Sequence, residues 1–386
     1  MPSPLNGIKV IEFSHMVMGP CAGLMLADMG AEVIKVEPFG GDKTRRLRGA
    51  GAGYFPMYNR NKKSLCIDLK SAEGKAAVLE LIKDADVFIE NFRPGALEKL
   101  GFGYAALKAL NPRLIYCSEK GFLDGPYAHR TALDEVTQMM GGLAYMTGPP
   151  GQPLRAGASV IDVTGGMFGA MGILAALNQR HATGEGQHIS AALFETTVFL
   201  VGQHMAQKAV TGQAAAPMPA RVSSWAIYQL FETKDHEQVF IGVVSDGQWK
   251  ILCNAFELEH LLEDPDLVEN RDRVIHKDKF LPQIVDKFKA LTKVELMEKI
   301  ETLGLPFAPI GRPEDMFDDP HLNAGGGLLD MEMEDGGRCK LPSLPISMNG
   351  ERLGLSMDPP KAGEHTDAIL ESLGLDIAAL KDKGVI

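Results

Sequence analysis

The chain has 386 residues, of which 45% are hydrophobic, and its formal net charge at pH 7 is −11. This length predicts two folding units, and the acidic balance argues against nucleic-acid binding, because affinity for phosphate requires a basic surface. The five cysteines are scattered without the spacing of metal ligands, which predicts neither a metal site nor disulfides and is typical of a cytoplasmic protein. The first residues lack a charged segment before an apolar one, so no signal peptide is expected.

The first half of the chain alternates short apolar runs with helical patterns. Strands are expected at 8–13, 31–37, 64–69, 86–90 and 114–118, with helices at 21–29 and 72–84. Two strands joined by a helix of this length imply a parallel pair with a right-handed crossover. The pattern therefore predicts an α/β fold, in which a Rossmann-like parallel sheet carries helices on both faces.

The second half begins with two expected helices, from about 164 to 181 and from about 189 to 209. An aspartate and four glycines interrupt the apolar stretch around the first of them, which favours a buried helix over a membrane span. A linker rich in Ala and Pro follows at 214–220. Beyond it, a hairpin of 226–231 with 238–244 and then mostly helices predict a smaller α+β domain.

Asp162 is the first candidate for a functional residue. An apolar run ends at this aspartate, and the expected helix opens with Gly165 and Gly166 just after it. Asp162 is either an N-cap or a reactive carboxylate that the helix N-terminus keeps ionised, and the free N–H groups there could also stabilise an oxyanion. The glycines would let a bulky thioester approach the backbone, and a carboxylate is a suitable nucleophile when the product must stay activated.

Further candidates lie near expected strand ends. His15 follows the first strand, where open α/β sheets bind ligands, and is either catalytic or a structural loop histidine. Glu37 ends the second strand and could mimic the ribose-binding acid of NAD enzymes, although their GxGxxG fingerprint is absent. Asp134 and Glu135 precede an apolar helix, so either could cap it or act as an acid or base near Asp162.

Basic residues also accompany these turns. They either receive the phosphates of a nucleotide cofactor or form ordinary solvated surface. The residues are Lys35, Arg45, Arg46, Arg60, Lys62, Lys63, Lys70, Arg93 and Lys99.

Longer motifs recur along nearly the whole chain and together carry a family resemblance. The motifs are GIKVIEF at 7–13, GP at 19–20, GAEVIKVEP at 30–38, NRNKKS at 59–64, ENFRPG at 90–95, NPRLI at 111–115, DVTGG at 162–166, GLP at 304–306 and GEHTD at 363–367. On these motifs the chain resembles the class III CoA-transferases, the family that includes formyl-CoA transferase, the carnitine and bile-acid CoA-transferases and α-methylacyl-CoA racemase.

The resemblance implies a domain organisation and an assembly. A large Rossmann-like domain that binds coenzyme A would comprise residues 1–210 and 325–386, and a small α+β domain would comprise 225–315, with linkers at 211–224 and 316–324. It also implies an interlocked homodimer, in which each chain threads through a ring made by the other.

The resemblance further implies the site. The family's nucleophile falls on Asp162, and Asp134 matches an acidic position near it. Contacts with coenzyme A carry over to Val17, Met18, Ile67, Asp68, Leu69, Lys70, Asn91, Phe92, Arg93 and Lys99. The expected substrates are an acyl-CoA and a small carboxylic acid, with no metal, nucleic acid or membrane involved. His15, Arg46 or Arg221 would steer the acceptor carboxylate.

Departures from the family pattern narrow the function. Racemases of the family have a histidine base where this chain has Leu133, and racemisation needs a proton donor and acceptor on opposite faces of the α-carbon. Formyl-CoA transferases have a glutamine in place of Val17 and a glycine-rich lid that residues 217–225 lack.

The predicted function is transfer of CoA between carboxylates through aspartyl anhydride and aspartyl-CoA thioester intermediates. A 2-methylacyl-CoA racemase is the alternative, and an NAD-binding oxidoreductase is a more distant one.

Overall fold

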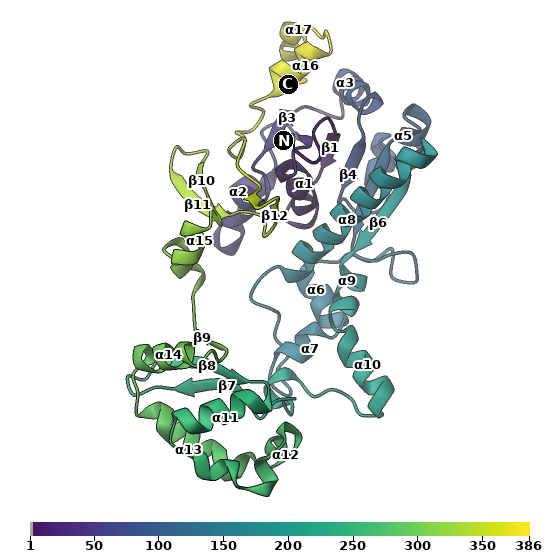
Figure 1. The fold of residues 1–386 in the computed structure, drawn as a ribbon. Helices are drawn as coiled ribbons and strands as arrows, with labels where there is room; N and C mark the ends of the chain where they lie inside the picture. The colour runs from purple at the N-terminus through teal and green to yellow at the C-terminus, as the bar shows by residue number, and fades with distance from the viewer. Residues whose placement is uncertain (1–2) are drawn as a thin grey trace. The chain divides into compact units, whose positions relative to one another are not determined.

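The computed structural model describes residues 3–386, which form two compact units. The first unit runs up to Pro219 and resumes as Pro320–Ile386, and the second is Ala220–Asp319. The chain therefore leaves the first unit once and returns to it (Figure 1).

A six-stranded parallel sheet forms the centre of the first unit. Its strands are β1 (Lys9–Phe13), β2 (Glu32–Glu37), β3 (Lys62–Cys66), β4 (Val87–Glu90), β5 (Ile115–Lys120) and β6 (His188–Ala192). The order is β3-β2-β1-β4-β5-β6, which is that of the doubly wound dinucleotide-binding fold. The predicted α/β fold with a parallel sheet is confirmed. The expected helix at 189–209 is wrong at its start, because this segment pairs with β5 as the sixth strand.

Side chains alternate between the two faces of the sheet, as the twofold period of a strand requires. Val10 and Val87 pack on one face under helices α1 (Met18–Asp28) and α8 (Val160–Thr183). Ile11 and Phe88 pack on the opposite face. The helices that cover this second face are α3 (Ala72–Lys83), α5 (Tyr104–Leu110), α16 (Thr366–Ser372) and α17 (Ile377–Asp382).

Helix α8 packs closely on α1. A Cβ at Gly166 would lie 2.6 Å from the main-chain oxygen of Met18, so this glycine permits the contact between the two helices. The expected role of Gly166 in admitting a thioester is therefore replaced by a packing role. By length and hydropathy alone α8 could cross a membrane, and 44% of its most apolar window is buried inside the protein.

Shorter helices follow the strands of the first unit. They are α2 (Tyr54–Tyr58), α4 (Ala96–Leu100), α6 (Asp134–Met140), α7 (Leu143–Thr147), α9 (Leu193–Leu200) and α10 (Gly202–Thr211).

The second unit has its own core. The predicted hairpin is confirmed as antiparallel β7 (Ile227–Glu232) and β8 (Gln238–Val243), and β9 (Phe307–Pro309) completes the sheet. Trp249, Phe280 and Phe288 fill the space between this sheet and the helices. The helices are α11 (Asp246–Ala255), α12 (Asn270–Ile275), α13 (Lys277–Lys289) and α14 (Lys293–Thr302).

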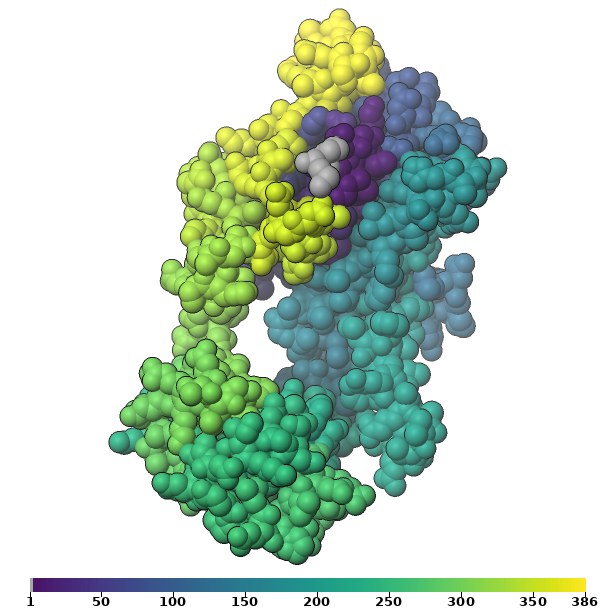
Figure 2. Space-filling view, in the orientation of Figure 1, coloured from purple at the N-terminus to yellow at the C-terminus, as the bar shows by residue number. Residues whose placement is uncertain are grey.

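The returning C-terminal segment packs against the N-terminal strands of the first unit. Figure 2 shows this yellow segment directly against the purple N-terminal part of the chain. Main-chain N–H groups of Ser356 and Met357 donate to the Asn61 side chain, and the Gly363 N–H donates to the Ser64 hydroxyl. The elements of this segment are α15 (Pro320–Ala324), β10 (Leu328–Glu332), β11 (Arg338–Pro342), β12 (Ser347–Met348), β13 (Glu351–Arg352), α16 and α17.

Candidate active site

A cavity of about 590 Å³ opens at the carboxyl ends of β1, β4 and β5. Ligands bind at this edge of open α/β sheets, and the strand order reverses between β1 and β4. The loops after these strands and the first turn of α8 form the wall. The wall includes His15, Met18, Asn91, Phe92, Arg93, Glu119, Lys120, Arg130, Asp134 and Asp162.

Asn91 holds the loops after β1 and β4 together. Its side-chain amide donates to the His15 carbonyl oxygen at 2.8 Å, and its side-chain oxygen accepts from the His15 N–H at 3.1 Å. The His15 ring lies 5.2 Å from the Phe92 ring. Burial lowers the pKa of His15, so the imidazole is neutral at pH 7 and adds no positive charge to the wall.

Asp162 lies in the first turn of α8, which begins at Val160 instead of near residue 164. Ser159 holds the N-cap position, so the interpretation of Asp162 as an N-cap is wrong. No group of residues 3–386 donates a hydrogen bond to the Asp162 carboxylate, which lines the cavity. The carboxylate is therefore free to meet a ligand.

Asp134, the first residue of α6, caps the first turn of α8 from outside that helix. Its Oδ2 accepts hydrogen bonds from the N–H groups of Ile161 and Asp162 at 2.9 and 3.1 Å. Gln138 donates to its other oxygen. These two N–H groups are therefore already occupied by Asp134 and do not serve Asp162 or an oxyanion. Asp134 instead positions the turn that carries Asp162.

Burial, together with the negative charges of Asp134 and Glu135, raises the pKa of Asp162 to about 7, and Arg155 opposes this shift. The prediction that the helix N-terminus keeps Asp162 fully ionised at neutral pH is wrong. The anionic fraction of Asp162 instead rises with pH through the neutral range. Such a pKa shift in a cavity is typical of a functional carboxylate.

Reaction of an acyl-CoA with Asp162 would require the carboxylate anion, so we expect kcat/KM for CoA transfer to rise with pH through about pH 7 and then level off.

In Asp134→Asn the remaining side-chain oxygen can still cap α8, but a negative charge is lost. The pKa of Asp162 should fall, and the acid limb should move to lower pH by up to about one unit. Profiles of kcat/KM from pH 5 to 9 measure this shift, and an unmoved limb would contradict it. Glu135→Gln is the matched control, with a smaller expected shift because Arg155 already pairs with Glu135.

A second carboxyl group, that of Glu119 near the end of β5, lies in the same wall but is buried. Neither of its oxygens has a hydrogen-bond partner among residues 3–386. Burial raises the pKa of Glu119 well above its usual range, and the nearby acids Glu12 and Asp162 raise it further. Burial therefore favours the neutral, protonated form of this carboxyl group.

The chain matches known proteins along nearly its whole length. The model of CoA-transferase family III matches residues 5–366. This chain belongs to that family. It is 38% identical to a succinate–glutarate CoA-transferase of Agrobacterium fabrum over 96% of each protein, and 35% identical to an acetyl-CoA:oxalate CoA-transferase of Acetobacter aceti over 90% of each.

A solved structure agrees with these relatives. A CAIB/BAIF family protein from Brucella suis is 34% identical and superposes with a TM-score of 0.84, covering 97% of this chain and 100% of that one. The predicted enzyme class, an acyl-CoA:carboxylate CoA-transferase, is confirmed.

The coenzyme A contacts expected of this family III enzyme fall into two groups. Met18 and the loop of Asn91, Phe92 and Arg93 line the cavity with Asp162. The remaining residues do not line it, and they are Val17, Ile67, Asp68, Leu69, Lys70 and Lys99. Val17 and Ile67 are buried in the core, which leaves only their main chain for a ligand. The role of both groups stays a prediction.

Several basic residues proposed as phosphate ligands instead form buried ion pairs inside the protein. Lys35 and Lys62 are fully buried beside Glu12, at 3.5 and 2.8 Å from its carboxylate oxygens. Arg60 is fully buried and pairs with Asp28 at 2.6 Å. These three side chains cannot reach a nucleotide, so the phosphate interpretation is wrong for them.

Of the two expected acceptor-steering arginines, only Arg46 belongs to the unit that contains the cavity. Arg46 donates to the Gly40 carbonyl oxygen at 2.8 Å and does not line the wall, and Arg221 belongs to the second unit. His15, the third proposed residue, lines the cavity.

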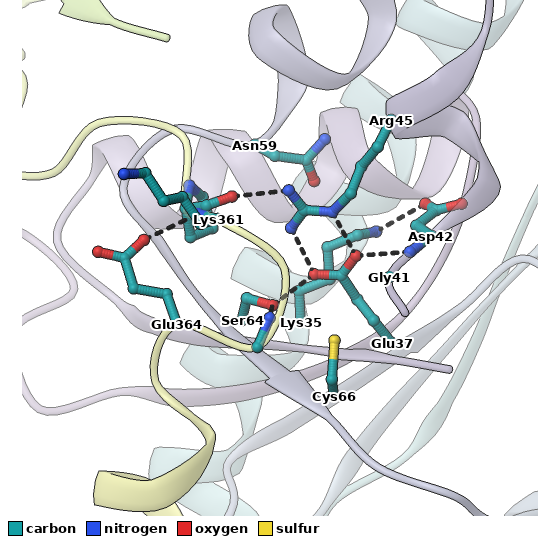
Figure 3. Close-up of polar contacts among 12 residues, drawn as sticks. Lys35, Glu37, Gly41, Asp42, Arg45, Asn59, Ser64, Cys66, Lys361 and Glu364 are labelled. Carbon is teal, nitrogen blue, oxygen red and sulfur yellow. Dashed lines mark hydrogen bonds and ion pairs between the residues drawn. The ribbon is translucent and has the colours of Figure 1, made fainter. Parts of the chain in front are cut away.

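Both oxygens of the Glu37 carboxylate accept hydrogen bonds from neighbouring residues (Figure 3). Arg45 donates two hydrogen bonds to it, at 2.7 and 2.8 Å, and the Ser64 hydroxyl donates at 2.6 Å. The Asp42 main-chain N–H donates at 2.8 Å. Glu37 therefore has no free oxygen for a ribose, which removes the feature that suggested an NAD enzyme.

Sequence reasoning missed several residues of the wall, among them Glu119, Lys120, Tyr54 and Arg130. Glu119 and Lys120 are charged residues at the end of an apolar strand, and that position was a usable signal. Tyr54 and Arg130 have no pattern that places them near Asp162. Across residues 3–386, no three His, Cys, Asp or Glu side chains are grouped closely enough to hold a metal ion.

Proposed function

We propose that the protein moves CoA from an acyl-CoA to a free carboxylic acid with Asp162 as the covalent carrier. The observation that supports this most directly is the Asp162 carboxylate itself, which lines a cavity of about 590 Å³ and accepts no hydrogen bond from residues 3–386. A carboxylate held rigidly by its helix and left unpaired in a cleft is suited to nucleophilic attack.

The proposed first half-reaction consumes the donor. An Asp162 oxygen attacks the thioester carbonyl carbon, the C–S bond breaks, and the CoA thiolate leaves with the electron pair. The product is a mixed anhydride of the donor acid and Asp162. The thiolate then attacks the Asp162 Cγ, which releases the donor carboxylate and leaves an aspartyl-CoA thioester.

The second half-reaction is the reverse with a different acid. The acceptor carboxylate attacks the same Cγ, and the thiolate leaves again. The CoA thiolate then attacks the acceptor's carbonyl carbon in this anhydride, which yields acceptor acyl-CoA and restores the Asp162 carboxylate. Every intermediate is an activated acyl group, so no nucleotide hydrolysis is needed. Water must be excluded while the anhydride exists.

The family's racemase activity is not favoured by this site. The position of the racemase histidine is Leu133, an exposed apolar side chain in the wall beside Asp134. That position therefore supplies no proton acceptor.

The proposed carrier role is tested by adding acyl-CoA without an acceptor. Intact-mass measurement should show a shift equal to CoA minus water, and peptide mapping should place it on Asp162. Absence of the adduct, or its location on another residue, would refute the proposal. Incorporation of solvent deuterium at the α-carbon of a 2-methylacyl-CoA, with no acceptor present, would instead favour the racemase.

We also propose a homodimer, interlocked as the resemblance implies, that works in the cytoplasm. Large apolar side chains of α8, α9 and α10 are exposed, which supports a partner covering these helices. They are Met167, Met171, Phe199, Leu200, Met205 and Val210. Light scattering coupled to gel filtration should give the mass of two chains.

A further inference from the structure

The acidic groups of the cavity wall, apart from Asp162, are all compensated or neutral. Glu135 forms an ion pair with Arg155. Asp134 accepts from two main-chain N–H groups and from Gln138. Glu119 is buried, and burial raises its pKa and favours its neutral form. The wall therefore has little negative charge left to pair with a cation.

The cations of the wall are not balanced in the same way. Lys120 forms an ion pair with Glu90 and donates to the Phe92 carbonyl oxygen at 2.9 Å. No acidic side chain of residues 3–386 forms an ion pair with Arg93 or Arg130. The cavity consequently has uncompensated positive charge and is suited to an anion.

Arg130 is held in place by aromatic rings. Its guanidinium carbon lies 5.2 Å from the centre of the Tyr127 ring and 5.9 Å from that of Phe122. These rings pack edge-on at 5.8 Å, and Phe122 packs on Phe194 at 5.5 Å. A cation–π contact uses none of the guanidinium N–H groups as hydrogen-bond donors, and no residue of 3–386 accepts a hydrogen bond from the Arg130 side chain.

The loop that carries Arg130 also has a defined backbone. The Arg130 N–H donates to the Tyr127 carbonyl oxygen at 2.9 Å, and the Ala128 N–H donates to that of Gly125 at 3.1 Å. The same loop continues into α6, whose first residue Asp134 caps the turn of Asp162. A free guanidinium edge is thus preorganised in the wall that contains the reacting carboxylate.

We propose that Arg130 binds the distal carboxylate of the substrate, and that the enzyme therefore acts on dicarboxylic acids and their CoA monothioesters. This inference rests on the proposed role of Asp162, which would engage the other end of the same molecule. Arginine binds a carboxylate through two parallel N–H···O bonds, which gives orientation as well as affinity. A monocarboxylic acid has no group for this edge.

The CoA phosphates are the competing ligand for the guanidinium. In coenzyme A the whole pantetheine arm separates the phosphates from the sulfur, whereas the second carboxylate of a short diacid is a few carbons from the reacting carbonyl. Arg93 stands in the loop expected to contact coenzyme A and remains available for phosphate. Loss of Arg130 should therefore weaken only substrates that have a distal carboxylate, whereas loss of Arg93 should weaken every CoA thioester.

The test compares adduct formation on Asp162 from succinyl-CoA and from butyryl-CoA, which differ by the distal carboxylate. In Arg130→Gln, the ratio of kcat/KM for succinyl-CoA to that for butyryl-CoA should fall about 30-fold or more. This is the effect expected from losing a hydrogen bond to a charged group. Arg130→Lys should retain part of the ratio. Arg93→Gln should weaken both thioesters alike, and His129→Ala, an exposed neighbour outside the wall, is the matched control.

Equal weakening of both thioesters in Arg130→Gln would assign the guanidinium to the phosphates and overturn the proposal. An unchanged ratio would overturn it as well. Unchanged thermal unfolding of the variant would show that a lost ratio is not a folding defect. Failure of the proposed carrier role has a different signature, because then neither thioester would form an adduct on Asp162 even in the parent enzyme.

Discussion

Replacement of Asp162 by asparagine is expected to abolish CoA transfer, with a fall in kcat of at least about 10³-fold. The amide has nearly the shape of the carboxylate and keeps the main-chain N–H that Asp134 accepts from. It cannot, however, form the anhydride, because an amide is a poor nucleophile. The rate is measured by mass spectrometry of the acyl-CoA products from a matrix of donors and acceptors.

The same variant should give no covalent adduct with acyl-CoA, whereas binding of unreacted thioester should persist within about tenfold. Asp162→Ala belongs in the comparison, because an asparagine can deamidate and restore the aspartate. Asp124→Asn, an exposed acid outside the cavity wall, is the matched control and should transfer CoA at the parental rate. Parental turnover in both Asp162 variants would rule out the carrier role.

The second large effect is expected on stability, from the buried carboxylate of Glu37. Burial by itself raises the pKa of Glu37, but hydrogen bonds from Arg45 and the charges of Lys35 and Arg45 outweigh it and lower the pKa. In Glu37→Gln these two buried cations lose a counter-charge. Removal of one partner from a buried ion pair costs about 3–5 kcal/mol, which would lower Tm by about 10 °C.

The pH dependence of this loss follows from the lowered pKa. The Glu37 contribution is fully present above the pKa of a glutamate in the unfolded chain and disappears as the pH falls through the lower folded pKa. The difference in Tm between parent and Glu37→Gln should therefore be large at pH 7 and shrink towards pH 3. Glu73→Gln is the control, because this exposed glutamate forms a surface pair with Lys383 and its loss should scarcely change Tm.

The Glu37 variant should also loosen the C-terminal segment. Arg45 donates to the Pro360 carbonyl oxygen at 2.8 Å, and Ser64 binds both Glu37 and the Gly363 N–H. In Glu37→Gln, hydrogen exchange of residues 355–366 should be faster than in the parent protein, while exchange in the helices of the second unit should be unchanged. Unchanged exchange of residues 355–366 in the variant would show that the packing of the C-terminal segment does not depend on Glu37.

The order of strands and helices in the first half could be predicted from the sequence alone. An apolar run such as Ile8 to Phe13 encodes its structure locally, within a few residues. The same reasoning placed His15 at the carboxyl end of the first strand and Asp162 beside the start of a helix, whereas Asn91 was proposed from the family resemblance. Local signals of this kind do not depend on the rest of the chain.

Only the tertiary structure decided the chemistry of these groups. Asp134 caps the helix of Asp162 although 28 residues separate them, Lys35 and Lys62 are neutralised by Glu12, and β6 is a strand because β5 lies beside it. Each of these facts depends on a contact between segments distant in sequence, and local sequence patterns do not predict such contacts. The pKa of Asp162 is decided in the same way, since it depends on burial and on charges that folding brings near.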